Sequence, residues 1–130
     1  MIRKMHEAKL NEKRYVDMLG TGTARREFLH VDDAAKACLF LLEEYDSPEP
    51  INIGTGEDQT VRELALLVQE IVGFEGQLVW DASKPDGTPR KQLDTRKIND
   101  LGWHPTIGLE EGIRSTYAWF LEHAQSDARL

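Results

Sequence analysis

The fold class of this chain is decided by residues 60–73, which read TVRELALLVQEIVG. Thr60 and Glu63 have the spacing of a capping box, in which each side chain accepts from the other residue's backbone N–H. Gly73 is the usual kind of residue for a helix end. Between them, apolar residues recur every three or four positions, at Val61, Leu64, Ala65, Val68, Ile71 and Val72. The stretch therefore predicts an amphipathic helix with one face in a core.

Short strands and further helices are expected on both sides of this helix. The predicted strands are residues 15–19, 26–31, 51–53 and 77–80, and the other predicted helices are residues 2–12, 32–44, 95–101 and 109–123. Asp32 is expected to cap its helix, whereas no capping residue precedes Ile2. The alternation of strands and helices indicates an α/β fold. The strands are nevertheless short, and they are too few to make a large sheet by themselves.

Composition excludes several classes of partner. The 130 residues carry 16 Lys and Arg against 23 Asp and Glu, a net charge of −7, which argues against a nucleic-acid or anionic-membrane surface. No apolar run approaches the roughly 20 residues of a membrane span, and no signal peptide is recognisable, so a cytoplasmic location is expected. Cys38, the only cysteine, lies in the apolar run 37–42 and is expected to be a small buried core residue. The helix around this run is expected to be buried on more than one side.

The residues themselves predict no complete active site. Neither Gly20-Thr21-Gly22 nor Gly54-Thr55-Gly56 completes a dinucleotide fingerprint. The histidines lack metal-ligand spacing, and no tyrosine is followed by lysine four positions later. We therefore assign no catalytic, cofactor-binding or metal-binding residue. What remains is a set of cations beside turns, namely Arg25, Arg26, Arg90 and Lys91, which suit a pyrophosphate or are simply solvated surface charges.

Two stretches resemble a known family. Residues 20–33, GTGTARREFLHVDD, resemble the segment of extended short-chain dehydrogenases that precedes their penultimate sheet helix. Residues 81–91, DASKPDGTPRK, look like the corresponding loop of GDP-L-fucose synthases, and relatives acting on UDP- or dTDP-sugars usually differ here. The resemblance runs over almost the whole chain. These enzymes convert GDP-4-keto-6-deoxy-mannose to GDP-L-fucose by 3,5-epimerisation and NADPH-dependent 4-reduction.

The resemblance implies a set of substrate-binding residues. Arg26 corresponds to the arginine that contacts the nucleotide-sugar phosphates, and Lys91 lies beside it in this interpretation. Asp86 is expected at the nucleotide end, where a carboxylate can accept from guanine N1–H and N2–H together. Lys4 matches a basic substrate-contacting position. Leu19 stands where the family usually has tryptophan, so it keeps apolar contact with the ligand but loses a stacking face.

The resemblance also implies what lies elsewhere in the family. Its Ser-Tyr-Lys set, its catalytic Cys and His and its NADP fingerprint all lie N-terminal to the position that matches Met1. On this interpretation the chain is the substrate-binding portion of such an enzyme, inactive without the N-terminal Rossmann half, and NADP(H) is expected to bind the full-length enzyme rather than this chain alone. Two alternatives stay open: a portion of another nucleotide-sugar epimerase or dehydratase, and a non-catalytic nucleotide-sugar binding module.

Residues 1–124 are expected to form one sugar-nucleotide-binding domain, followed by a frayed tail at 125–130. Within this domain, residues 31–56 contain elements that would pack on the Rossmann sheet. Alone, these elements would expose apolar surface and a strand edge. Self-association into a homo-oligomer, or rearrangement of this hairpin-like unit, is therefore predicted for the isolated chain.

Overall fold

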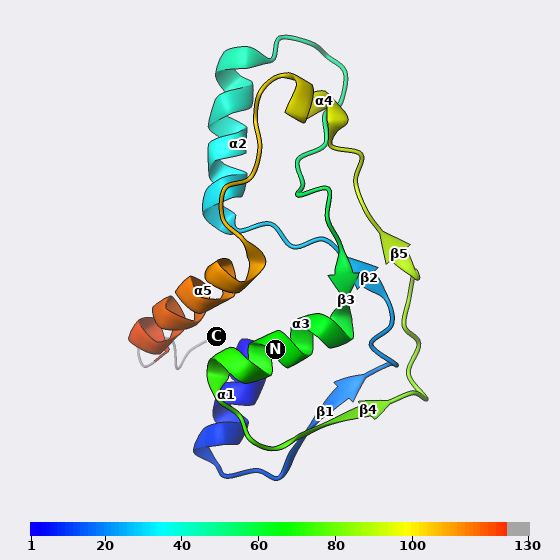
Figure 1. Cartoon of the computed structure of the whole chain (residues 1–130), viewed down its shortest axis with the longest axis vertical. Coiled ribbons are helices and arrows are strands. Elements are labelled where there is room, and N and C mark those ends of the chain that lie inside the picture. Colours follow the sequence, from blue (N-terminus) through cyan, green and yellow to red (C-terminus); the bar gives the residue numbers. More distant parts are fainter. Residues whose placement is uncertain (125–130) are drawn as a thin grey trace.

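A computed structural model describes residues 1–124, and the predicted frayed tail lies outside these residues. The helices are α1 (Ile2–Leu10), α2 (Val31–Glu44), α3 (Val61–Val72), α4 (Arg96–Asp100) and α5 (Leu109–His123), and the strands are β1 (Tyr15–Leu19), β2 (Arg25–Arg26), β3 (Gln59–Thr60), β4 (Gln77–Asp81) and β5 (Arg90–Lys91). Figure 1 shows α2 and α4 at one end of the long axis and α1, α3, β1 and β4 at the other. The α/β class is confirmed.

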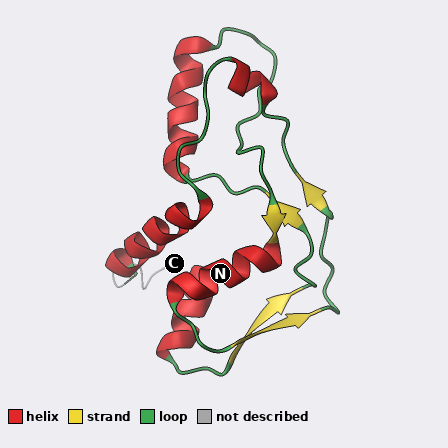
Figure 2. Cartoon of the chain, viewed as in Figure 1, coloured by secondary structure: helices red, strands yellow, loops and turns green. Residues whose placement is uncertain are grey.

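The strands form two small sheets. In one, β1 pairs with β4 in parallel, from Tyr15 opposite Gln77 to Leu19 opposite Asp81. The other has the order β3-β2-β5, with β2 antiparallel to β3 and parallel to β5. Figure 2 shows that long loops, rather than strands, connect the two ends of the molecule. The predicted scarcity of strand is confirmed, and the β1–β4 sheet shares its core with helices.

The helix predicted at residues 60–73 organises the larger core. Thr60 forms both bonds of the capping box with Glu63, and Gly73 ends α3 with a φ of 69°. Its buried face packs with α1, α5 and the β1–β4 sheet, and the buried residues of this cluster are Met5, Ala8, Val16, Met18, Ala65, Val68, Val72, Phe74 and Ile113. Burial of a side chain the size of valine or methionine contributes roughly 1.5–3 kcal/mol. These local predictions are confirmed.

A smaller core lies under α2. Ala37, Ile98 and Trp103 are its buried members, and Leu29, Phe40, Leu41, Ile51 and Ile53 pack against them. Two predictions are wrong here. Cys38 is exposed, and α2 is buried on one side only, since Leu42 is 82% exposed. The physical reason is that α4 and the 51–53 segment cover one face of α2, while no described element covers the other.

Several elements also differ from the prediction. Residues 51–53 and 27–30 form no strand, because none of them pairs with a neighbouring strand among the described residues. Helix α2 begins at Val31, and its cap is His30, whose Nδ1 accepts from the Asp32 N–H at 3.2 Å. Asp32 is thus the second residue of the helix instead of its cap. A carboxylate in the first turn still complements the helix dipole.

Asp33 attaches α2 to the segment that precedes α5. Its carboxylate is 1% exposed, and it accepts from the Thr106 N–H at 3.0 Å, the Thr106 hydroxyl at 3.0 Å and the Ile107 N–H at 2.8 Å. Burial by itself raises the pKa of Asp33, but these hydrogen bonds outweigh it and hold the pKa below its ordinary value. The segment that leads into α5 is thereby attached to α2.

No described helix has the length and apolar character needed to cross a membrane.

Candidate functional site

The predicted site centres on the turn that follows β1. Gly20 and Gly22 have φ of 77° and 76°, a left-handed backbone that favours glycine. Between them, the Thr21 N–H donates to Asp86 Oδ1 and the Thr21 hydroxyl donates to Asp86 Oδ2, both at 2.6 Å. These hydrogen bonds hold the pKa of Asp86 below its ordinary value. The bond from the Thr21 hydroxyl has the largest effect, and the bond from the Thr21 N–H has the next largest. Asp86 therefore ties the 81–90 loop to this turn as a carboxylate.

Arg62 and Trp80 support the same turn, and neither was predicted from the sequence. The Arg62 guanidinium lies 4.7 Å from the centroid of the Trp80 ring, and its Nη2 donates to the Thr21 carbonyl at 2.6 Å. A Cβ at Gly22 would lie only 2.6 Å from the same ring, so glycine is required there for space as well as for φ. The cation–π contact and the hydrogen bond fix the backbone that holds Asp86.

Arg26 and Lys91 occupy matching positions on neighbouring strands. They are Cα partners in the parallel β2–β5 ladder. Arg26 Nη1 donates to the Arg25 carbonyl at 2.6 Å, while its Nη2 lies 3.9 Å from the place where a Cβ on Gly87 would stand. Since Gly87 follows Asp86, the fold brings Arg26, Lys91 and Asp86 around one loop. The substrate-binding role expected of these three residues stays a prediction.

The other two predicted cations have a different role. Arg25 Nε donates to Asp58 Oδ1 at 2.9 Å, and Arg90 Nε donates to Asp58 Oδ2 at 2.5 Å. The Asp58 side chain is only 3% exposed. Hydrogen bonding from Arg90, and then from Arg25, holds the pKa of Asp58 below its ordinary value in spite of burial. The sequence alone did not identify Asp58. Of the four cations beside turns, Arg25 and Arg90 are paired with this carboxylate.

Leu19 lies on β1, and Lys4 contacts this strand from α1. Lys4, on α1, donates through Nζ to the Asp17 carbonyl. Leu19 is the last residue of β1, next to the Gly20–Gly22 turn, and is 71% exposed. Leu19 therefore borders the site directly, whereas Lys4 is connected to it through the strand.

Within residues 1–124, no cluster of three or more His, Cys, Asp and Glu side chains could hold a metal ion.

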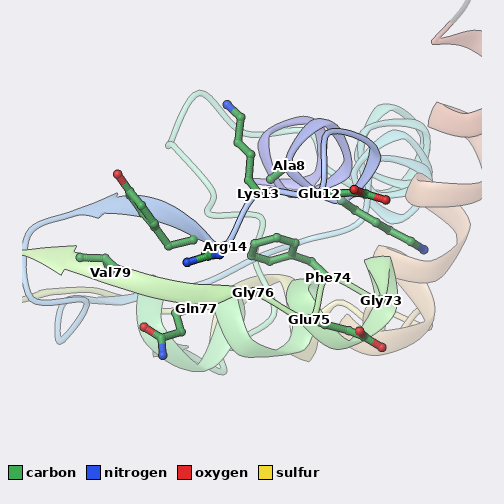
Figure 3. A pocket seen from close by; sticks show the side chains of 12 residues that line it. Ala8, Glu12, Lys13, Arg14, Gly73, Phe74, Glu75, Gly76, Gln77 and Val79 are labelled. Atoms are coloured by element: carbon green, nitrogen blue, oxygen red, sulfur yellow. The ribbon is translucent and has the colours of Figure 1, made fainter.

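A large cavity lies elsewhere in the molecule. It measures about 910 Å³ and is lined by the end of α1, the start of β1 and residues 73–77. Figure 3 shows Arg14 and Phe74 at its centre and Lys13 at its rim. None of the predicted site residues lines it. The cavity and the candidate site are therefore separate features.

Known proteins match the chain along nearly its whole length. Residues 1–54 match the model of the NAD dependent epimerase/dehydratase family. GDP-L-fucose synthase 1 of Arabidopsis thaliana is 54% identical over 95% of this chain and 38% of its own length. GDP-L-fucose synthase of Escherichia coli (strain K12) is 47% identical over 95% of this chain and 41% of its own length.

A solved structure gives the same result for the fold. The GDP-L-fucose synthetase of Naegleria fowleri bound to NADP superimposes with a TM-score of 0.90 and 29% identity, over 96% of this chain and 40% of that one. The chain spans about two-fifths of the length of the relatives it matches, 38% and 41% for the two curated ones. By sequence and by fold, the chain is similar to part of the GDP-L-fucose synthases.

Proposed function

We propose that this chain is the GDP-sugar-binding portion of a GDP-L-fucose synthase. The observation that carries the proposal is the β2–β5 ladder, which aligns Arg26 with Lys91 while Asp58 engages their neighbours Arg25 and Arg90. The identity to GDP-L-fucose synthases supports the choice of ligand. In the whole protein, the reaction would be 3,5-epimerisation and NADPH-dependent 4-reduction of GDP-4-keto-6-deoxy-mannose.

Arg26 and Lys91 would bind the diphosphate. A guanidinium can donate two parallel hydrogen bonds to phosphate oxygens, and an ammonium adds a compact charge beside it. The net charge of −7 makes this local pair important, because the molecule as a whole repels anions. A diphosphate held between two adjacent strands would place its nucleoside toward the 81–90 loop.

Asp86 would recognise the guanine. Each carboxylate oxygen already accepts one hydrogen bond from Thr21, so guanine would use lone pairs that these bonds leave. The N1–H and N2–H of guanine form a donor pair that matches two carboxylate oxygens, whereas uracil has no such pair. Thr21 would then fix the orientation of the carboxylate. Leu19 would give apolar contact beside this carboxylate. Lys4 would affect the site through its hydrogen bond to the Asp17 carbonyl on β1.

The chemistry is assigned to the rest of the enzyme. In this proposal the chain supplies no catalytic residue, and NADP(H) is held by the three-fifths of the relatives that the chain does not match. That portion would cover the exposed apolar face of α2, which includes Leu39 and Leu42. The chain's own contribution is to bind and orient the GDP end of the substrate.

Replacement of Arg26 tests the proposal. We expect Arg26→Met to weaken GDP binding to this chain at least tenfold, because a charge-assisted hydrogen bond contributes about 1.5–3 kcal/mol. Isothermal titration calorimetry gives the dissociation constants. Arg114→Met is the matched control, since Arg114 pairs with Glu110 on the exposed surface of α5. Equal GDP affinity in the Arg26 variant and the control would overturn the assignment.

A further inference from the structure

Asp58 is a buried carboxylate shared by two strands. It accepts from Arg25 on β2 and from Arg90 on β5, and its own backbone carbonyl accepts from Arg25 Nη2 at 2.8 Å. Asp58 immediately precedes β3, the third strand of the same sheet. One residue therefore contacts or adjoins all three strands at the point where the cations gather.

The register of the sheet separates the four cations into two pairs. Arg25 is the partner of Arg90, and Arg26 is the partner of Lys91. Successive side chains of a strand point to opposite faces. Because Asp58 holds Arg25 and Arg90 on one face, Arg26 and Lys91 are directed to the other face, where Arg26 approaches Gly87.

Charge repulsion makes this register costly without Asp58. Like charges directly opposite each other destabilise a pair of strands. Here two successive positions of the β2–β5 ladder both place cation against cation. The Asp58 carboxylate lies between the first pair and converts their repulsion into two ion pairs. It thereby offsets the cost of bringing Lys91 next to Arg26.

We propose that Asp58 is a positioning residue, which holds β2 and β5 in register so that Arg26 and Lys91 converge on one diphosphate. This inference rests on the proposed function for its ligand. It assigns Asp58 no contact with the substrate. It also explains why Arg25 and Arg90 lie next to the anion site but bind Asp58 instead of the anion.

The sign of the affinity change separates positioning from simple charge. Asp58→Asn makes the chain more positive by one unit, so an effect of charge alone would tighten the binding of GDP. Loss of positioning instead weakens it, by roughly tenfold if one charge-assisted contact is lost. Asp94→Asn is the matched control, because it removes the same charge from the exposed Asp94–Arg96 pair.

A readout without ligand tests the register itself. The Arg25 N–H donates to the Pro89 carbonyl across β2 and β5 at 2.8 Å, and the Val61 N–H donates to the Ala24 carbonyl on the other side of β2 at 2.9 Å. In Asp58→Asn, amide hydrogen exchange measured by NMR should accelerate at Arg25 and stay slow at Val61. Asp94→Asn should leave both slow, and Asp58→Glu, which keeps both acceptor oxygens, should retain most of the Arg25 protection.

Each outcome has a defined meaning. Unchanged Arg25 exchange in Asp58→Asn, or tighter GDP binding, overturns the inference. If Asp58→Asn does not fold, Arg90→Gln removes only the β5 half of the contact, and it must accelerate Arg25 exchange if the inference is right. If the wild-type chain does not bind GDP while the exchange pattern is as expected, the proposed function fails and the role of Asp58 in the register stands.

Discussion

At the scale of single residues, neighbours in sequence have opposite roles. Arg25 and Arg26 are adjacent, yet Arg25 is held by Asp58 while Arg26 faces the 81–90 loop. The sequence groups them as one basic cluster because the partner of Arg25 is 33 residues away along the chain. The pairing of strands, rather than local composition, determines which cation is available for an anion.

Leu19 offers a residue-scale test by gain of binding. We expect Leu19→Trp to bind GDP about fivefold more tightly, because an added stacking contact contributes roughly 1 kcal/mol. Fluorescence or calorimetric titration measures the change. Leu10→Trp is the control, since Leu10 is 69% exposed at the end of α1, far from the turn after β1. Equal or weaker GDP binding in Leu19→Trp would show that Leu19 does not face the ligand.

At the scale of elements, the local signals of α3 and β1 were reliable, whereas the local signal for an Asp32 cap and the signals that depend on distant partners were not. The capping box and glycine of α3 and the bounds of β1 follow from residues close together in sequence, and they were predicted correctly. Residues 51–53 have a strand-like pattern but no partner strand among the described residues, so they stay irregular. Asp33 and Asp58 could not be identified because their partners are 73 and 32 residues away, in segments with no shared pattern.

The attachment of α2 to the segment before α5 gives an element-scale prediction. Asp33→Asn should lower the free energy of unfolding by about 2–4 kcal/mol, because buried N–H and hydroxyl groups lose the charged acceptor. The folded-state pKa of Asp33 is below the ordinary 3.8, so its contribution is present above that pH and is lost as pH falls through the lower value.

Urea denaturation at several pH values measures both effects. The wild type should lose stability below pH 3.8 more steeply than Asp33→Asn, in which this group does not titrate. Asp94→Asn is the control for removal of an exposed carboxylate. Parallel stability curves for the wild type and Asp33→Asn below that pH would contradict the assignment of acid sensitivity to Asp33.

At the scale of the whole molecule, one face of α2 has no cover. Val31, Leu39 and Leu42 are all exposed large apolar residues on this helix. Exposed apolar faces of this kind mark interaction surfaces. An exposed apolar face on α2 is thus observed, while its packing against a Rossmann sheet stays part of the proposal.

Self-association of the isolated chain follows from that face. We expect multi-angle light scattering to report species larger than a monomer at micromolar concentration. Replacing Leu39 and Leu42 together by lysine should shift the population toward monomer, because two charges would be buried in any such contact. Leu10→Lys, which changes an exposed leucine on α1, should leave the distribution as in the wild type. A monodisperse wild-type monomer would contradict the prediction.

Calorimetric titration of the wild-type chain with GDP and with UDP tests the central claim most directly. If Asp86 and the Arg26–Lys91 pair form a GDP-sugar site, GDP should bind with a micromolar dissociation constant and UDP at least tenfold more weakly, and Asp86→Ala should abolish this preference by removing the carboxylate that guanine needs. Absence of GDP binding, or equal binding of GDP and UDP by the wild type, would contradict the account.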